Sequence, residues 1–413
     1  MLDFASAFSR VVATAEATSD VEYVSLADAG DRFLAEDQVS FVNVPGFANS
    51  AMDGYAVRAS EIIVDTPYSV SQRIAAGDQP SALAPGTVAR IFTGAMLPEG
   101  ADTIILQENA QDDGQHVYFS EPISAGQNVR PAGQDIAHGG LLVSAGDRLS
   151  AASLALLASA GIPRVRCFKA LRIAFFSTGD ELCEPGEPLV AGQIYNSKRY
   201  ALRQLLLDLN VIPIDLGFCP DDPASTRAML LQASSMADGV ITTGGMSVGE
   251  EDHVLAQAAQ LGEIDFWKIA IKPGKPFACG KIGSAAFFGL PGNPVSSFVT
   301  FQLLVRPWLL KKMGATDYLH RCVNAVVNFN QNNAGKRLDF LRGTLTSSEE
   351  GNLQVSLFDN QSSGVMSSLA VSNVLIPLAP NSKINIGALH RVIALTDQAL
   401  SFASERWLKT DEI

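Results

Sequence analysis

The sequence predicts a multidomain α/β protein, with a central three-layer α/β/α domain between β-rich regions. Over residues 170–315, apolar strands alternate with helical segments at the spacing typical of a parallel sheet covered by helices on both faces. On either side of this stretch, short alternating runs are broken by Gly and Pro, which favours small β-rich structures. The 413 residues are enough for two to four domains.

The first half of the chain contains short elements until a helix begins after Ser150. Residues 50–136 consist of alternating runs separated by turn residues, which predicts a small β-rich domain. Ser150 can cap a helix over 151–159, because its hydroxyl can accept a hydrogen bond from a backbone N–H of the first turn. Gly161 and Pro163 then end that helix.

The central and C-terminal regions differ in their patterns. In the central region we expect strands over 172–177, 211–216 and 239–242, and helices over 197–209, 225–236 and from Pro294 to near Gly314. After Gly314 the pattern returns to short strands, which predicts a small β-barrel or sandwich; the candidate strands cover 323–329, 338–345, 353–358, 374–378 and 392–395.

The balance of charge limits the class of partner. Lys and Arg number 30 and Asp and Glu 43, which gives a formal net charge of −13. Such a field repels nucleic acid and anionic membranes, so we expect neither as a partner. A small anionic substrate remains compatible, because it responds to local charge.

Other classes are disfavoured by missing patterns. The five cysteines include no CxxC pair and the five histidines no HExxH pattern, so we expect neither a disulfide framework nor a zinc site. The first residues lack a basic segment before an apolar stretch, and no run reaches about 18 apolar residues, so we expect neither a signal peptide nor a membrane-spanning helix. The expected location is the cytoplasm.

Three loops directly follow apolar strands of the central region, at the edge where open parallel sheets bind ligands. The first, Ser177–Glu181, places Asp180 and Glu181 after Gly179, which permits an unusual turn. Two adjacent carboxylates at a sheet edge predict a metal ligand or an acid–base group. A solvated turn, with Asp180 capping the next element, explains the same residues.

The second loop ends at Asp252 and contains paired glycines, Gly244 and Gly245. Glycines after a strand let backbone N–H groups approach an anion, and Thr243 and Ser247 add hydroxyl donors. Asp252 enters the next helix, where it could hold Mg²⁺ together with substrate phosphates. An ordinary capped connection between a strand and a helix is the alternative.

The third loop, Leu290–Ser296, has two prolines around a Gly-Asn turn, which aims a helix N-terminus and its positive dipole at the crevice. Packing alone is an equal explanation. Before this loop, Lys268, Lys272 and Lys275 alternate with apolar residues and would supply positive potential near the crevice. A half-exposed edge strand decorated with lysine is the alternative.

One further segment outside the central region is typical of a site. Asn49–Ala56 follows a Pro-Gly turn, has too few apolar residues for a core, and holds a single acid, Asp53. A tight connector is equally compatible with this composition. Thr93-Gly94 forms another small-residue loop after a strand.

Six motifs occur in this order: Asn49–Ala56, Thr178–Leu182, Gly192–Asn196, Thr243–Glu250, Ile271–Pro276 and Gly289–Pro294. Together they resemble the molybdopterin molybdenumtransferase family, known as MoeA in bacteria and as the E domain of gephyrin. The match runs from about Pro45 to the end of the chain and includes Arg337–Gly343 and Gln361–Gly364.

The resemblance implies an elongated homodimer of four-domain subunits. The implied domains are an N-terminal elongated domain (1–49 with 137–169), a small inserted β-rich domain (50–136), a molybdopterin-binding α/β domain (170–315) and a C-terminal β-barrel domain (316–413). The active cleft would lie between the α/β domain and the small domain of the partner subunit. The implied reaction joins molybdate to adenylyl-molybdopterin with the help of Mg²⁺ and releases AMP and molybdenum cofactor. Contact with the molybdopterin adenylyltransferase is also expected.

The resemblance assigns roles residue by residue. Catalytic roles fall on Asp53, Glu181, Asp252 and Lys272, and the implied Mg²⁺ ligands are Glu181 and Asp252. The implied substrate-binding residues are Thr93, Asp135, Asp221, Thr243, Gly244, Gly245, Ser247, Lys268, Lys275, Pro291, Pro294, Arg342 and Ser363. Among these, Arg342 and Ser363 are implied to contact molybdate.

One departure and two alternatives accompany this assignment. Gln134 stands where the family usually has a glutamate, which changes the charge beside Asp135. A non-catalytic pterin-binding scaffold of the same fold is the alternative function, but a scaffold needs no trio of carboxylates such as Asp53, Glu181 and Asp252. The related adenylyltransferase step needs only the α/β domain, so the two β-rich regions argue against it.

Overall fold

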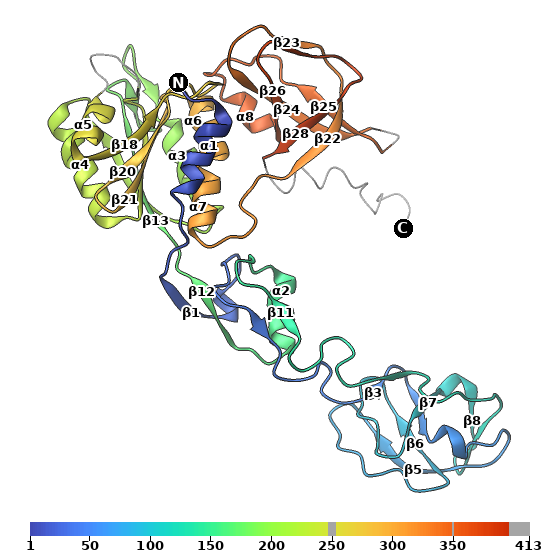
Figure 1. Cartoon of the computed structure of the whole chain (residues 1–413). Coiled ribbons are helices and arrows are strands. Elements are labelled where there is room, and N and C mark those ends of the chain that lie inside the picture. The colour runs from blue at the N-terminus through green and yellow to red at the C-terminus, as the bar shows by residue number, and fades with distance from the viewer. Residues whose placement is uncertain (247–252, 349–350, 396–413) are drawn as a thin grey trace.

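The computed structural model describes residues 1–246, 253–348 and 351–395. Figure 1 shows an elongated molecule: an α/β part and a C-terminal barrel lie side by side at one end, and a small β-rich region lies at the other. A narrow middle region joins them. The predicted fold class, a multidomain α/β protein with a central α/β/α domain, is confirmed.

The α/β part is built on a six-stranded sheet with the order β16-β13-β17-β21-β20-β18. Strands β16, β13, β17 and β21 are parallel, whereas β20 and β18 join antiparallel. The bounds are β13 (Arg172–Thr178), β16 (Ile212–Cys219), β17 (Gly239–Thr243), β18 (Gly262–Trp267), β20 (Ala278–Ile282) and β21 (Ala285–Leu290). The three predicted strands are therefore confirmed, while β18 and β20 carry no signal that the sequence analysis used.

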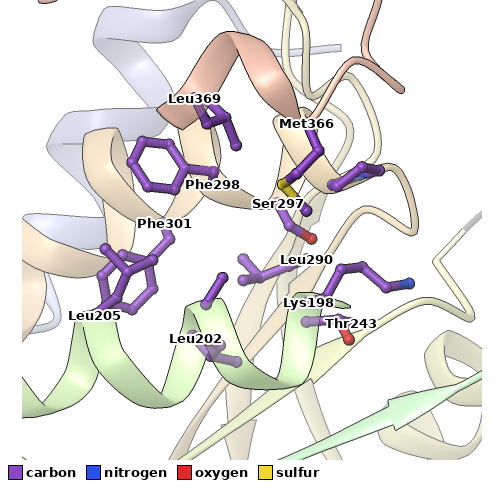
Figure 2. A pocket seen from close by; sticks show the side chains of 12 residues that line it. Lys198, Leu202, Leu205, Thr243, Leu290, Ser297, Phe298, Phe301, Met366 and Leu369 are labelled. Atoms are coloured by element: carbon purple, nitrogen blue, oxygen red, sulfur yellow. The ribbon is translucent and has the colours of Figure 1, made fainter. Parts of the chain in front are cut away.

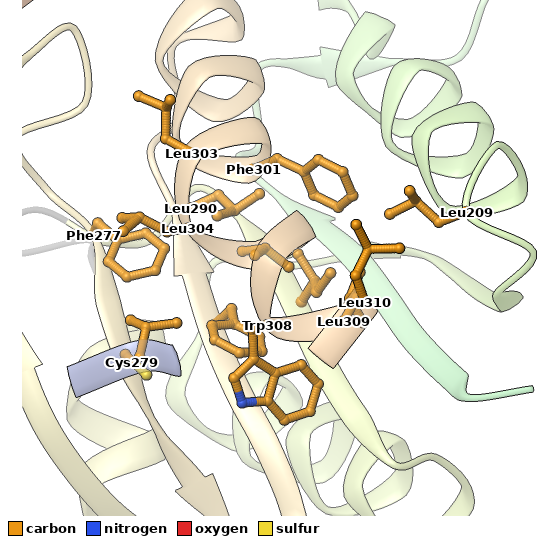
Figure 3. Close-up of a cluster of buried hydrophobic side chains, with 14 of the residues drawn as sticks. Leu209, Phe277, Cys279, Leu290, Phe301, Leu303, Leu304, Trp308, Leu309 and Leu310 are labelled. Carbon is orange, nitrogen blue, oxygen red and sulfur yellow. The ribbon is translucent and has the colours of Figure 1, made fainter. Parts of the chain in front are cut away.

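Helices cover both faces of this sheet. One face carries α4 (Pro223–Met236) and α5 (His253–Leu261); the other carries α1 (Phe4–Ala13), α3 (Ser197–Leu207), α6 (Pro294–Thr300), the π-helical turn η4 (Phe301–Val305) and α7 (Arg306–Lys312). Figure 3 shows the hydrophobic core between the sheet and the helices of the second face, where Phe301, Leu304 and Trp308 pack against side chains of the sheet. The long helix predicted after Pro294 is therefore a run of three helical segments.

Helix α1 belongs to the α/β core although it begins the chain. Asp3 caps it by accepting a hydrogen bond from the backbone N–H of Ser6 at 2.9 Å, and Ala7 and Val11 are fully buried. The indole N–H of Trp308 donates to Thr14 at 3.0 Å. The implied boundaries group residues 1–49 with 137–169, whereas this helix packs on α7 and η4. The boundaries themselves stay a prediction.

The middle region consists of short elements. Its strand pairs are antiparallel: β1 (Val21–Ser25) with β12 (Arg164–Phe168), and β2 (Gln38–Val39) with β11 (Leu141–Val143). Helix α2 (Ala151–Ser159) has the predicted bounds, and the hydroxyl of Ser150 accepts from the backbone N–H of Ser153 at 3.1 Å. The capped helix is confirmed.

The small β-rich region holds a four-stranded sheet with the order β5-β6-β4-β7. Its strands are β4 (Gly54–Val57), β5 (Ser69–Ile74), β6 (Thr87–Ile91) and β7 (Thr103–Leu106), accompanied by the pairs β8 (Ala110–Asp112) with β9 (Val117–Phe119) and β3 (Asn49–Ser50) with β10 (Val129–Arg130). A Cβ atom on Gly54 would lie 1.9 Å from the carbonyl oxygen of Ile105. Only glycine therefore allows β4 and β7 to approach this closely.

The C-terminal region forms a closed five-stranded barrel rather than a sandwich. The strands pair in the order β24-β25-β22-β28-β26, and β26 returns to β24. They are β22 (Cys322–Val327), β24 (Leu338–Ser347), β25 (Leu353–Leu357), β26 (Val374–Leu378) and β28 (Leu389–Ala394), with the pair β23 (Gln331–Asn333) and β27 (Ser382–Ile384) and helix α8 (Ser367–Val371) beside them. Strand β19 (Ile271–Lys272) extends the α/β part onto β24.

Over the described ranges 1–246, 253–348 and 351–395, no helix combines the length and the apolar character that crossing a bilayer requires.

Candidate active site

The loops after the parallel strands meet at one edge of the sheet. The backbone N–H of Gly244, after β17, donates to the carbonyl of Leu290 at the end of β21 at 3.2 Å. The backbone N–H of Asp180 donates to the carboxylate of Asp221 at 3.2 Å, and the N–H of Asp221 donates back to Asp180 at 3.3 Å. The loops after β13, β16, β17 and β21 therefore form one continuous surface.

Two glycines allow this close approach. A Cβ atom on Gly244 (φ 108°) would lie 2.7 Å from the carbonyl oxygen of Thr178. A Cβ atom on Gly179 (φ 133°) would lie 2.4 Å from a carboxylate oxygen of Glu181. Gly244 needs both a positive φ and an absent side chain, because the carbonyl of Thr178 is backbone. Gly179 needs the positive φ, since the Glu181 side chain can move. The Glu181 carboxylate thus folds back over its own turn and is exposed.

The loop at the start of α6 brings the barrel to this edge. The backbone N–H of Val295 donates to the carbonyl of Ser363 at 3.1 Å, so Ser363 lies beside the loop that carries Pro291 and Pro294. A cavity of ≈ 20 Å³ opens between α3, α6 and α8. Figure 2 shows its lining, with apolar side chains around most of it and Lys198 and Thr243 at one end.

Arg342 does not face this edge. Its side chain is only 1% exposed, and it donates to the hydroxyl of Ser368 at 3.1 Å and to the carbonyls of Asn360 and Ser362 at 3.2 and 3.0 Å. Burial lowers the pKa of its guanidinium. The guanidinium uses its donors between the barrel, α8 and the loop before Ser363, and it holds that loop. This placement differs from the expectation that Arg342 contacts molybdate directly.

The predicted lysine strand is also corrected. Only Ile271–Lys272 form a strand, since Pro273 and Pro276 lack the N–H groups that a longer ladder needs. The ammonium of Lys268 lies 3.5 Å from the ring centroid of Trp267, and Lys275 is exposed. The three lysines therefore follow a turning chain rather than one face of a strand.

Two of these lysines nevertheless lie near the site: Lys268 is close to the glycine loop, and Lys272 is close to the barrel. The indole N–H of Trp267 donates to the carbonyl of Met246 at 3.0 Å, which puts Lys268 beside the glycine loop. The ammonium of Lys272 pairs with the buried carboxylate of Asp339 at 2.9 Å, where β19 meets the barrel. No contact between Lys272 and Glu181 is present among the described residues.

Asp53 and Thr93 form a pair in the small β-rich region. The backbone N–H and the hydroxyl of Thr93 both donate to one oxygen of Asp53 at 2.7 Å. These hydrogen bonds, with a smaller contribution from Arg90, hold the pKa of the Asp53 carboxyl below its usual value. In Figure 1 this region lies at the opposite end of the molecule from the sheet edge. A single chain therefore does not bring the pair to the α/β loops.

Of three further predicted site residues, the structure places one away from the sheet edge and does not describe the other two. Asp135 is exposed in the connection to the small β-rich region, and its backbone N–H donates to the carbonyl of Val44 at 3.0 Å. Ser247 and Asp252 lie outside the described residues.

Within 1–246, 253–348 and 351–395, no group of three or more His, Cys, Asp or Glu side chains is arranged to hold a metal ion.

Lys198 is a site residue that the sequence analysis missed. It occupies the first turn of α3, and its side chain is only 7% exposed. Burial lowers the pKa of its ammonium, and the charges of Glu181 and Asp221 oppose that shift. Lys198, Leu202 and Leu206 are spaced four residues apart and all face inward. This spacing was available in the sequence and could have identified a lysine on the buried face of the helix.

The fold and the loops define a class of protein first: an α/β domain with a ligand-binding type of sheet edge, accompanied by accessory β-rich regions. Residues 174–311 match the family described as "probable molybdopterin binding domain". Residues 2–161 match "MoeA N-terminal region (domain I and II)", and residues 324–395 match "MoeA C-terminal region (domain IV)".

Full-length relatives narrow this class to one family. The chain is 43% identical over 382 residues to a molybdopterin molybdenumtransferase of Haemophilus influenzae, which covers 92% of this chain and 94% of the relative, and 32% identical over 374 residues (87% of this chain, 86% of the relative) to that of Bacillus subtilis. The crystal structure of the molybdopterin biosynthesis MoeA protein of Pyrococcus horikoshii superposes with a TM-score of 0.82 at 27% identity, over 95% of this chain and 100% of that one. The chain belongs to the molybdopterin molybdenumtransferase family: it is a transferase of molybdenum cofactor biosynthesis.

Proposed function

We propose that this chain inserts molybdate into adenylyl-molybdopterin and releases AMP together with molybdenum cofactor. The observation that carries the proposal is the convergence of the loops after β13, β16, β17 and β21 with the loop before α8. This surface combines exposed carboxylates, glycine-lined backbone and a buried ammonium. A phosphorylated pterin needs this combination of backbone donors and cations for its phosphates.

The reaction places distinct demands on the chain. Breaking a phosphoanhydride accumulates negative charge on phosphate oxygens, which cations must stabilise. Molybdate is a tetrahedral dianion that prefers hydroxyl, ammonium and guanidinium donors. Ser363 and Lys272, which is about half exposed, supply two of these donors. Arg342 contributes indirectly, because it holds the carbonyls that precede Ser363.

Magnesium fits the donor chemistry of this edge. The ion takes one or two carboxylates together with substrate phosphate oxygens rather than a complete protein cage. Glu181 is exposed, and Asp221 is half-buried beside it. Glu181 and Asp252 would hold the ion, which would neutralise charge on the phosphates when bound.

The distance between Asp53 and the sheet edge supports a homodimer. A two-fold axis that ran two elongated chains in opposite directions would bring the small β-rich region of one copy to the α/β loops of the other. Asp53 would then enter the cleft as a carboxylate, because Thr93 stabilises its charged form. Contact with the adenylyltransferase that produces the substrate, in the cytoplasm, would complete this assignment.

The direct test mixes the purified chain with adenylyl-molybdopterin, Mg²⁺ and molybdate and follows AMP. We expect AMP to form only when molybdate is present. Tight pterin binding without molybdate-dependent AMP would contradict the transferase reaction and would favour a pterin-binding scaffold.

A further inference from the structure

Lys198 is an unusual residue for its position. A cation in the first turn of a helix opposes the positive end of the helix dipole, and a buried ammonium loses its hydration. Buried charges are therefore normally paired or hydrogen-bonded. Among the residues that the structure describes, the ammonium of Lys198 makes neither a hydrogen bond nor an ion pair within 4.0 Å. Glu181 and Asp221 act on it only through their charge.

The surroundings of Lys198 leave donors available for an acceptor. Asn196, which precedes α3, does not cap the helix, because its side chain contacts Ser177 at 3.2 Å and Glu184 at 3.3 Å instead. The first backbone N–H groups of α3 therefore lack a side-chain partner of this kind. Figure 2 shows that Lys198 extends away from the apolar lining and that its amine lies at the same end of the cavity as the hydroxyl of Thr243.

A second observation comes from the neighbouring strand. The hydroxyl of Thr178, at the end of β13, is buried and has no hydrogen-bond partner among the described residues. It faces the glycine loop, since a Cβ atom on Gly244 would lie 2.8 Å from it. Buried polar groups without partners are uncommon, and two of them at the sheet edge are consistent with a polar ligand or water bound there.

We propose that Lys198 binds a phosphate-type oxyanion of the substrate at the start of α3. The next residue of α3, Arg199, is already engaged: its guanidinium contacts Asp215 at 2.8 Å and Glu184 at 3.0 Å. An oxyanion between Lys198 and a cation held by the neighbouring carboxylates would be neutralised from both sides. The identity of this anion as part of a pterin or of AMP rests on the proposed function; the oxyanion subsite does not.

The test compares variants of the full-length chain. Lys198→Met keeps the length of the side chain and removes a buried charge, so we expect it to fold. In calorimetric titrations with AMP and, separately, inorganic phosphate, we expect its dissociation constants to rise about 10-fold or more, the scale of a lost charge-assisted hydrogen bond. Lys198→Arg, which keeps the charge, should weaken binding less than Lys198→Met does. The matched control is Lys281→Met, because Lys281 is exposed at the opposite edge of the same sheet.

The outcomes separate the possible sources of the anion. Weaker binding of both AMP and inorganic phosphate supports the subsite, and unchanged binding of both overturns it by leaving Lys198 as a counter-ion for Glu181 and Asp221. A third titration uses molybdate; a variant whose binding of molybdate alone is weakened would also overturn the phosphate assignment. A chain that forms no AMP but binds phosphate through Lys198 would lose the proposed function and keep the subsite.

A second measurement needs no variant. Acetic anhydride should label Lys198 more slowly when inorganic phosphate is present, with Lys281 as the reference in the same mass spectrum. Equal labelling of Lys198 with and without phosphate would contradict the proposal.

Discussion

The barrel and the small β-rich region are attached to the α/β part in different ways. The barrel is joined through buried polar contacts: β19 pairs with β24, and the ring nitrogens of His320 face the carbonyls of Gln302 and Ala394 at 2.7 and 3.2 Å. The small β-rich region is joined to the middle region by the short pair β3 and β10 and a single bridge between Val44 and Ile136.

This difference separates two kinds of site residue. Arg342 is buried at the barrel and supports the structure, so changing it affects folding and function together. Asp53 is half-buried, and the printed hydrogen bonds of its carboxylate come from Thr93 alone, so changing it should affect function more than stability. We therefore expect substitutions of buried barrel residues to change stability and turnover together, and substitution of Asp53 to change mainly turnover.

The largest effect expected is on turnover in Asp53→Ala. Removing a carboxylate that would act in the cleft should lower AMP formation by about 100-fold or more, while the melting temperature falls no further than in a control that loses a comparable hydrogen bond. Asp78→Ala is the matched control, since Asp78 also accepts a backbone N–H in a turn of the same region. Loss of folding in Asp53→Ala would show instead that the loop around Asp53 is a structural connector.

A mixture of two inactive variants gives the next largest effect. If the cleft combines Asp53 of one copy with Glu181 of the other, unfolding and refolding Asp53→Ala with Glu181→Gln together should form mixed dimers with one intact cleft. Random pairing would restore about a quarter of the unaltered turnover. Size-exclusion chromatography would confirm the dimers, and a mixture of dimers no more active than either variant would place both residues in one chain's site.

The smallest effect concerns the barrel junction and pH. Burial, together with the charge of Arg306, lowers the pKa of His320 to about 4 from its ordinary value of 6.5. As pH falls below 6.5, the unfolded chain takes up a proton that the folded chain resists until about pH 4. The free energy of unfolding should therefore fall over this range by ~1–3 kcal/mol.

Urea titrations at pH 7 and pH 5 measure this change in the free energy of unfolding. The drop between the two pH values should be smaller in His320→Gln, because glutamine does not titrate. An equal drop in both chains would assign the acid sensitivity to carboxylates elsewhere.

Periodicity explains how much of the fold the sequence predicts. The strands at 172–177 and 239–242 are continuous apolar runs, and the helix at 151–159 has a cap and a stop signal, so local patterns are sufficient for them. Local patterns do not predict strands β18 and β20, because β20 has no regular alternation of burial and the two strands take their register from tertiary pairing, β20 with β21 and β18 with β20. The lysine segment was assigned to one strand although Pro273 and Pro276 interrupt it.

The residues of the candidate site divide in the same way, into those that local patterns predict and those that depend on tertiary packing. Glycines and acids after strands identified the loops, because the carboxyl ends of parallel strands meet at one edge whatever the details of packing. The exposure of a side chain could not be predicted in this way. Arg342 has the residue type of an anion ligand, yet it lies on the outer face of the barrel, where α8 and the loop before it bury it. Lys198 was missed for the opposite reason, since a lysine in a helix suggests a solvated face.

The docking of α1 has a consequence for synthesis. Its partners on α7 come almost last in the α/β part, with sequence separations of 294 residues for Thr14 and Trp308 and 299 for Val12 and Lys311. At about 5–20 residues per second, a ribosome would need roughly 15 seconds or more to reach them. During that time the apolar face of a newly made helix has no native surface to cover it, so the earliest segment of this chain is a natural client for chaperones that act at the ribosome exit.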